Sequence, residues 1–384
     1  MVEASVTDFF ENPLVENISI VNNIGVKLFL TSYYHKFMVI PTGYYFYFGF
    51  NQIPIPSSFS LKVIASSIIH LLALLMITVL LFKRKKENLL LGFVVYFIFL
   101  LPILIFLDST AGIIAVRYSF NASLGFSLIL TSLLVYGYHS KQKMVKFVSL
   151  FAFSVIFITS VFFTISRNRD WKNKETLFSH DLKYLKQSYM ANRMGGIYFK
   201  FLAEQESANS SQQQKYLTSA SKYLNAAKEI YDQDPILWQN LGLLHWKQEE
   251  YKQAFFSFKN AVSLDSTNTA SWNYYGNFCE FAKDFDRAEE AYKQIVTLEP
   301  TNPLGYKNLT SVLLNQQKID DAIFINRKLL LDDEMRKYGL ENLGHIYLAI
   351  RDTANAIQNF NQAFDEGLEN DVLKRDVSKL SKTF

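Results

Sequence analysis

Long apolar runs separated by short polar segments fill the first half of the chain. Residues 63–82 and 89–107 are runs of 20 and 19 residues without Asp, Glu, Lys or Arg. A helix rises about 1.5 Å per residue, so either run can cross a hydrocarbon core about 30 Å thick. Apolar stretches at 120–138 and 147–165 follow. The pattern predicts a transmembrane domain at 22–166 with four spanning helices at these ranges.

Residues 22–50 are aromatic-rich but interrupted by Lys27, His35 and Lys36. One interpretation is a further spanning helix. The other is an interfacial or re-entrant helix, which we favour because such polar groups are costly at the bilayer midplane. Residues 1–21 contain acidic residues and no apolar core, and they are predicted to form an extracytoplasmic loop.

Two basic loops predict the orientation of the apolar helices. Lys83–Lys86 is a run of four cations, and the segment 139–146 contains three lysines. Short cationic loops between spanning helices stay on the cytoplasmic side. We therefore expect an integral, multi-pass membrane protein whose residues after 166 lie in the periplasm or the ER lumen. Because these loops carry the excess positive charge, no nucleic-acid partner is expected.

The second half has a repeat of 34 residues, with units starting at 235, 269, 303 and 337. Small residues recur at the eighth and twentieth places, and large ones at the fourth and twenty-fourth. This is the pattern of tetratricopeptide (TPR) repeats, in which antiparallel helix pairs stack because no pair buries its apolar face alone. The eighth place holds Gly242, Gly276, Thr310 and Gly344, and the twenty-fourth holds Phe258, Tyr292, Asn326 and Phe360.

The whole chain is thus predicted to be all-α, a multi-helix transmembrane bundle followed by a TPR α-solenoid. Four repeats occupy 235–370, and 371–384 forms a polar capping helix. The segment 167–234 is predicted to hold the junction and a degenerate first repeat. Its insertion at 203–214, rich in Gln and Ser, is predicted to be a loop.

The sixth place of each repeat is predicted to line the concave surface of the solenoid. Side-chain amides there can bond the backbone of an extended peptide without selecting its sequence. The alternative is that Asn-Leu-Gly is a common repeat sequence with no binding role. The predicted groove residues are Asn240, Tyr274, Asn308 and Asn342, flanked by Trp246, Asn277, Glu280 and His345.

The cysteine and the histidines lack the spacing of a disulfide or a metal site. Cys279 is the single cysteine, which excludes an internal disulfide and a cysteine-based zinc site. The six histidines form no ligand-spaced pair, so no metal site is predicted. His70 lies within an apolar run, and we interpret it as a histidine hydrogen-bonded to neighbouring helices.

Several motifs occur in the order found in one membrane enzyme family. They are Phe10-Glu11-Asn12-Pro13-Leu14, the stretch from Val26 to Pro54, Ala115-Val116-Arg117-Tyr118-Ser119 with Ser123-Leu124-Gly125-Phe126, and Asn168–Phe178 with Trp171. Together with the repeats they make the chain resemble the C-terminal half of the transmembrane-and-TPR O-mannosyltransferase-like family, which has a membrane domain of the GT-C class.

The resemblance implies transfer of a sugar, mannose in particular, from a polyprenyl-phosphate donor to Ser or Thr of a secreted protein. Arg117 with Tyr118 would face the donor phosphate, and Glu11, Asn12 and Pro13 would form the family's loop motif. The acidic base that such a reaction needs is expected in an N-terminal half that this chain lacks. Val116 also departs from the family, which has an acidic residue there.

Two functions follow from these observations. In the first, the chain is a glycosyltransferase component, and its expected partners are membrane lipid, acceptor protein and a separate N-terminal transferase half. Alternatively it is a non-enzymatic membrane-anchored TPR scaffold. No cofactor is evident beyond the lipid-linked sugar donor. Whether the chain is an enzyme stays open.

Overall fold

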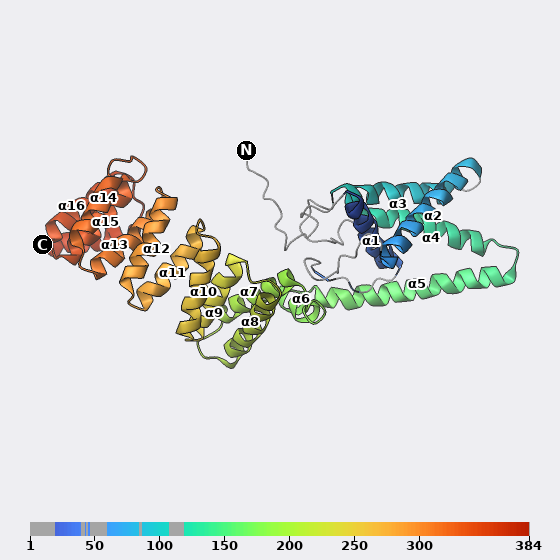
Figure 1. Cartoon of the computed structure of the whole chain (residues 1–384), viewed down its shortest axis with the longest axis horizontal. Coiled ribbons are helices and arrows are strands. Elements are labelled where there is room, and N and C mark those ends of the chain that lie inside the picture. The colour runs from blue at the N-terminus through green and yellow to red at the C-terminus, as the bar shows by residue number, and fades with distance from the viewer. Residues whose placement is uncertain are drawn as a thin grey trace. The chain divides into compact units, whose positions relative to one another are not determined.

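The computed structural model describes residues 20–39, 43, 45–46, 60–83, 87–106 and 119–383. Among these residues every regular element is a helix, which confirms the predicted all-α fold class (Figure 1). The chain divides into two compact units, residues 1–231 and residues 232–384. The first contains the apolar helices with the junction, and the second contains the repeats.

Five helices make up the apolar part of the first unit, in so far as the structure describes it. Within the described residues, the stretches Leu61–Val79, Phe120–Tyr138 and Lys143–Asp170 are long and apolar enough to cross a membrane, and the apolar stretch Glu87–Pro102 is shorter. The helices are α1 (Ile20–Val39), α2 (Leu61–Lys83), α3 (Glu87–Phe106), α4 (Ser119–Tyr138) and α5 (Lys143–Asp170).

Helices α1 to α4 share a core that includes Leu30, Tyr34, Leu100 and Ala122, each at most 1% exposed. Helices α3 and α4 pack backbone to backbone, because a Cβ added at Gly125 would lie 2.3 Å from the Tyr96 amide nitrogen. Helix α5 differs from them, since none of its residues is buried. Its apolar side chains therefore stay largely accessible, although the helix packs against α4 near Gly137.

A polar chain crosses the core of this bundle. His70 is 6% exposed, and its Nδ1 lies 2.8 Å from the Ser66 carbonyl oxygen. Its Nε2 lies 3.2 Å from Nε2 of His35, whose Nδ1 contacts the Tyr96 hydroxyl. With both rings neutral, the tautomers follow from the fixed carbonyl acceptor: Tyr96 donates to His35, His35 to His70, and His70 to Ser66. The prediction that His70 is hydrogen-bonded to neighbouring helices agrees with this geometry.

The same contacts concern the two interpretations of α1, as a spanning or an interfacial helix. The interfacial interpretation assumed that His35 would be costly at the bilayer midplane, but its ring is hydrogen-bonded to His70 and Tyr96 within the bundle, so His35 no longer favours it. Lys36 stays exposed.

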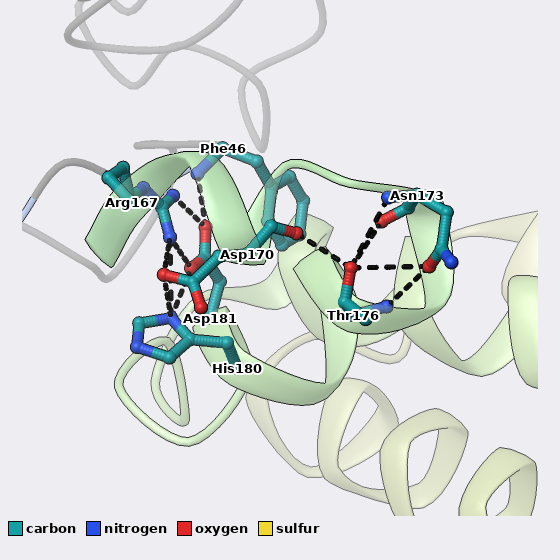
Figure 2. A network of polar contacts seen from close by, with 7 residues as sticks. All are labelled: Phe46, Arg167, Asp170, Asn173, Thr176, His180 and Asp181. Atoms are coloured by element: carbon teal, nitrogen blue, oxygen red, sulfur yellow. Dashed lines mark hydrogen bonds and ion pairs between the residues drawn. The ribbon is translucent and has the colours of Figure 1, made fainter. Parts of the chain in front are cut away.

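A buried carboxylate joins the end of α5 to α6 (Lys174–Asp181), as Figure 2 shows. The Asp181 side chain is fully buried, and its two oxygens lie 2.6 and 2.7 Å from the guanidinium nitrogens of Arg167. His180 Nδ1 lies 2.7 Å away, and the Phe46 amide donates at 2.8 Å. Such a bidentate, multiply bonded pair fixes the direction in which the chain leaves α5.

Two longer helices complete the first unit, α7 (Tyr189–Gln205) and α8 (Ser211–Ile230). The predicted loop at 203–214 is wrong, because only residues 206–210 separate these helices. The insertion lengthens both helices instead. The buried Gln213 amide on α8 donates to the Ala203 carbonyl on α7 at 3.0 Å. This hydrogen bond links the two helices next to the loop that connects them.

The second unit is a series of antiparallel helix pairs and a last helix. Asp234, Asn268 and Asn302 are spaced by 34 residues, and each caps the first helix of a pair with its side chain. The helices are α9 (Pro235–Lys247), α10 (Tyr251–Leu264), α11 (Thr269–Phe281), α12 (Phe285–Leu298), α13 (Pro303–Asn315), α14 (Ile319–Leu329), α15 (Arg336–Ala349), α16 (Thr353–Asp365) and α17 (Asp371–Thr383).

The eighth and twenty-fourth places meet within each pair. A Cβ added at Gly242 would lie 2.5 Å from the ring of Phe258, so the ring packs directly on the glycine backbone. The third pair exchanges both residues, with Thr310 replacing the glycine and Asn326 replacing the ring. There Asn326 Nδ2 donates to Thr310 Oγ1 at 2.6 Å, and a buried hydrogen bond takes the place of an apolar contact.

The turn inside each pair is also repeated. Glu249, Lys283, Gln317 and Arg351 have φ between 61° and 64°. In each case the following amide bonds a carbonyl five residues earlier at 2.8 Å, as in Glu250 to His245, which is the Schellman pattern at a helix end. The repeat length is thus set by backbone hydrogen bonding as well as by core packing.

Candidate protein-binding surface

The first helices of consecutive repeats, α11 and α13, are linked by polar side chains. Asn308 Nδ2 donates to Asn273 Oδ1 at 3.0 Å. Ser311 Oγ and Asn315 Nδ2 donate to Glu280 Oε1 at 3.1 and 3.3 Å. We call this set, with Asn277, the polar row. Ser311 and Asn315 are exposed and the others are partly buried, so the row faces solvent.

The row is anchored from beneath by Tyr292 on α12. Its hydroxyl donates to Asn277 Oδ1 at 2.7 Å and lies 3.1 Å from Glu280 Oε2. Burial raises the pKa of Tyr292, and the nearby Glu280 carboxylate raises it further. The tyrosine therefore keeps its single proton, which Asn277 Oδ1 and Glu280 Oε2 share as acceptors.

Three aromatic rings lie near the row, at the ends of α9 and α11 and at the start of α10. Phe281 is 52% exposed and Tyr251 is 45% exposed. The Phe281 ring centroid lies 5.2 Å from that of Trp246 and 5.5 Å from that of Tyr251. Trp246 also packs on Phe278, so it is fixed by the core. These three residues form the aromatic patch.

Of the four residues predicted to line the groove from the sixth place, burial contradicts the prediction for Asn342 alone, and for the other three it stays a prediction. The Asn240 amide donates to the Ile236 carbonyl of its own helix at 2.8 Å, and Tyr274 stacks on Phe258. Asn342 is 3% exposed and donates to buried Asn326 at 2.8 Å, so it belongs to the core rather than to a groove. Only Asn308 reaches the neighbouring first helix.

Of the polar row, Asn277, Glu280 and Asn308 were predicted from the sequence, whereas Asn273, Ser311 and Asn315 were missed. The fifth place holds Asn273, Lys307 and Glu341, and the ninth holds Asn277, Ser311 and His345. On a helix the fifth and ninth places share a face, whereas the sixth is rotated by about 100° from the fifth. Reading polar residues at i and i+4 would have added Asn273 and Ser311 to the predicted surface.

At the other end of the surface, the α15 residue His345 packs its ring edge-on against Phe360, with centroids 5.1 Å apart. Burial lowers the pKa of His345, opposed by Glu341 and reinforced by Lys307. The ring therefore favours its neutral form, in which it can both donate and accept.

The residues to which the family resemblance assigns a donor or loop role lie outside the described residues. These are Glu11, Asn12, Pro13, Arg117 and Tyr118. Among the residues that the structure describes, no group of three or more His, Cys, Asp or Glu side chains could hold a metal ion.

The helix pairs, their glycine–ring contacts and their repeated turns define the second unit as a TPR stack. The tetratricopeptide repeat family model matches residues 236–268, 270–302 and 339–365, which confirms three of the four predicted repeats. The matches omit 303–338, which includes Thr310 and Asn326, the pair that departs from glycine and ring.

Curated relatives resemble only part of the chain. BBSome complex member BBS4 of Xenopus tropicalis is 31% identical over 85 residues, 21% of this chain and 16% of that protein. Anaphase-promoting complex subunit 3 of Schizosaccharomyces pombe is 25% identical over 146 residues, 37% of this chain and 22% of that protein. The chain therefore spans less than a quarter of either relative.

Similar solved structures include YrrB, described as a TPR protein with an unusual peptide-binding site. It is 15% identical, with a TM-score of 0.40 and coverage of 54% of this chain and 98% of YrrB. PilF of Pseudomonas aeruginosa is 20% identical, with a TM-score of 0.34 and coverage of 47% of this chain and 79% of that chain.

Proposed function

We propose that this chain is a membrane-anchored interaction protein whose TPR unit binds an extended segment of a partner protein on the polar row. The observation that carries the proposal is the row itself: amides, a hydroxyl and a carboxylate held side by side on α11 and α13. Such groups can bond the backbone of an extended chain, while the aromatic patch beside them offers apolar contact.

The apolar helices supply the proposed anchor. Helix α5 leaves Phe151 and Phe162 more than 60% exposed, which suits contact with lipid tails rather than water. The basic loops at Lys83–Lys86 and 139–146 favour the cytoplasmic side. The TPR unit would then be extracytoplasmic, with a secreted or lumenal protein as its partner.

Peptide binding by the full chain in detergent micelles tests the proposal. A photo-crosslinking amino acid is placed at Asn277 on the row, or at exposed Glu290 on α12 as a matched control, and a display library of unstructured peptides is added. We expect crosslinks from position 277 only. The double variant Asn273→Ala/Asn308→Ala should weaken the selected peptides about tenfold, and equal crosslinking from position 290 would contradict the proposal.

Orientation is tested by cysteine labelling in sealed vesicles after Cys279→Ser. Single cysteines at Lys86 and Lys143 should react only from the cytoplasmic side, and one at Asn315 only from the opposite side. Labelling of Asn315 from the cytoplasm would remove the extracytoplasmic partner from the proposal. A cysteine at His35 distinguishes a spanning α1 from an interfacial one.

A second candidate function rests on the family resemblance alone. In it the chain presents acceptor protein to a sugar-transfer site, with Arg117 and Tyr118 at the polyprenyl-phosphate donor and a separate N-terminal half supplying the base. The purified chain, given a polyprenyl-phosphate-linked mannose and an acceptor peptide, should then be inactive alone and active once that half is added. Transfer by the chain alone would refute this division of labour.

A further inference from the structure

Glu280 is the one acidic member of the polar row, and its described partners are all neutral. Its carboxylate is contacted by the Tyr292 hydroxyl, the Ser311 hydroxyl and the Asn315 amide, at 3.1 to 3.3 Å. These groups come from α12 and α13 and fix the carboxylate from two sides. None of them brings a compensating positive charge.

Two other carboxylates of the same unit, Glu289 and Asp284, are paired with cations. Glu289, which is buried, lies between Lys293 and Lys318, with Lys318 Nζ at 2.7 Å. Asp284 is paired with Arg287 on its own helix. Glu289 and Asp284 thus have cations within the chain, whereas among the described residues Glu280 has none within 4.0 Å.

The carboxylate is also reachable from solvent. Glu280 is only partly buried, and both of its α13 partners are exposed. It occupies the twelfth place of its repeat, and Trp246 occupies the twelfth place of the preceding one. A chain that crosses α11 and α9 at this level meets first the carboxylate and then the aromatic patch.

A fixed carboxylate without a cation beside exposed rings is complementary to one kind of side chain. A Lys or Arg head group can bond Glu280, while its methylene stem and its charge both favour an aromatic face. Arg fits better, because its planar fork bonds a carboxylate and stacks on a ring at the same time.

We infer that the polar row selects an extended segment carrying an Arg or Lys, whose cation pairs with Glu280 and whose neighbouring apolar residue packs on the aromatic patch. The inference rests on the proposed function and narrows its partner to a segment with a cationic–apolar pair. An acidic segment is disfavoured at the same place, because it would set two carboxylates together.

Three fluorescent twelve-residue peptides test the selectivity on the full chain in micelles. Each has a Gly/Ser/Thr background and one central pair, Leu-Arg, Leu-Met or Leu-Glu. We expect the Arg peptide to bind about tenfold more tightly than the Met peptide, equivalent to about 1.4 kcal/mol, and the Glu peptide to bind most weakly. Raising the salt concentration should shrink the Arg preference.

The decisive variant is Glu280→Gln, which keeps an acceptor for Ser311 and Asn315 while Tyr292 can still donate to Asn277. It should reduce the Arg preference to less than twofold by weakening the binding of the Arg peptide more than that of the Met peptide. Glu290→Gln, on the exposed face of α12, is the matched control and should change nothing.

The outcomes separate this inference from the proposed function. Equal binding of the Arg and Met peptides, both weakened by Asn308→Ala, would overturn the selectivity and leave the binding surface in place. An Arg preference that survives Glu280→Gln would also overturn it. Failure of all three peptides to bind would count against both.

Discussion

Replacing Asn326 by leucine tests the buried polar exchange in the third repeat. Asn326 is fully buried, donates to Thr310 Oγ1 at 2.6 Å and to the Ala322 carbonyl at 2.8 Å, and accepts from Asn342 at 2.8 Å. Leucine branches at the same carbon and has the same number of side-chain heavy atoms, but it is larger than asparagine. Some overpacking therefore adds to the loss of the hydrogen bonds.

The loss of stability in Asn326→Leu depends on whether Thr310 and Asn342 keep hydrogen-bond partners. The Thr310 hydroxyl still donates to the Tyr306 carbonyl at 2.7 Å, so it retains a partner. The Asn342 amide, 3% exposed, loses its acceptor, and an unsatisfied buried donor costs about 1–3 kcal/mol. We therefore expect Asn326→Leu to lower the free energy of unfolding of the TPR unit by about 1–3 kcal/mol.

Urea unfolding followed by tryptophan fluorescence measures the change, because Trp238, Trp246 and Trp272 lie in this unit. Asn361→Leu on the exposed face of α16 is the control and should have little effect. Adding Asn342→Leu to Asn326→Leu removes the stranded donor, so the double variant should recover part of the loss. Strictly additive losses in the two single variants would refute the reasoning.

The geometry also predicts the sign of the effect for three further substitutions and one labelling experiment. Gly242→Ala places a Cβ 2.5 Å from the Phe258 ring and should destabilise the unit by about 1–3 kcal/mol in urea unfolding, with Phe258→Leu recovering part. Arg167→Met leaves the fully buried Asp181 carboxylate without its cation, so the local free energy of unfolding across 171–188 should fall by about 3–5 kcal/mol. Amide hydrogen exchange in this segment should accelerate accordingly, and unchanged exchange would contradict a stabilising role for the Arg167–Asp181 pair. Lys283→Gly relieves a φ of 61° and should stabilise the unit by about 0.5–1 kcal/mol, whereas Lys259→Gly within α10 should destabilise it. Burial raises the pKa of Cys279 to about 12, so the folded protein should resist iodoacetamide at pH 8 and react only in urea, as mass spectrometry would show; rapid labelling of the folded chain would contradict this.

The sequence alone predicted the elements because their signals are local and repeated. The 34-residue period with its small and large places was enough to locate four helix pairs, and the apolar runs were enough to locate α2 to α5. Helix periodicity and the lengths of apolar runs depend on residues close together in the chain.

Tertiary structure decided which polar groups face solvent. Asn342 and Asn308 share the sixth place, yet Asn342 is buried because Asn326, sixteen residues earlier, offers an acceptor where the other repeats have a ring. His35 lies inside the bundle because His70 and Tyr96, 35 and 61 residues away, satisfy its ring. Glu280 is fixed at the surface by α12 and α13 together. The chain position of a residue gives its place on a helix, but the free energy of burying a polar group depends on partners that only folding brings near.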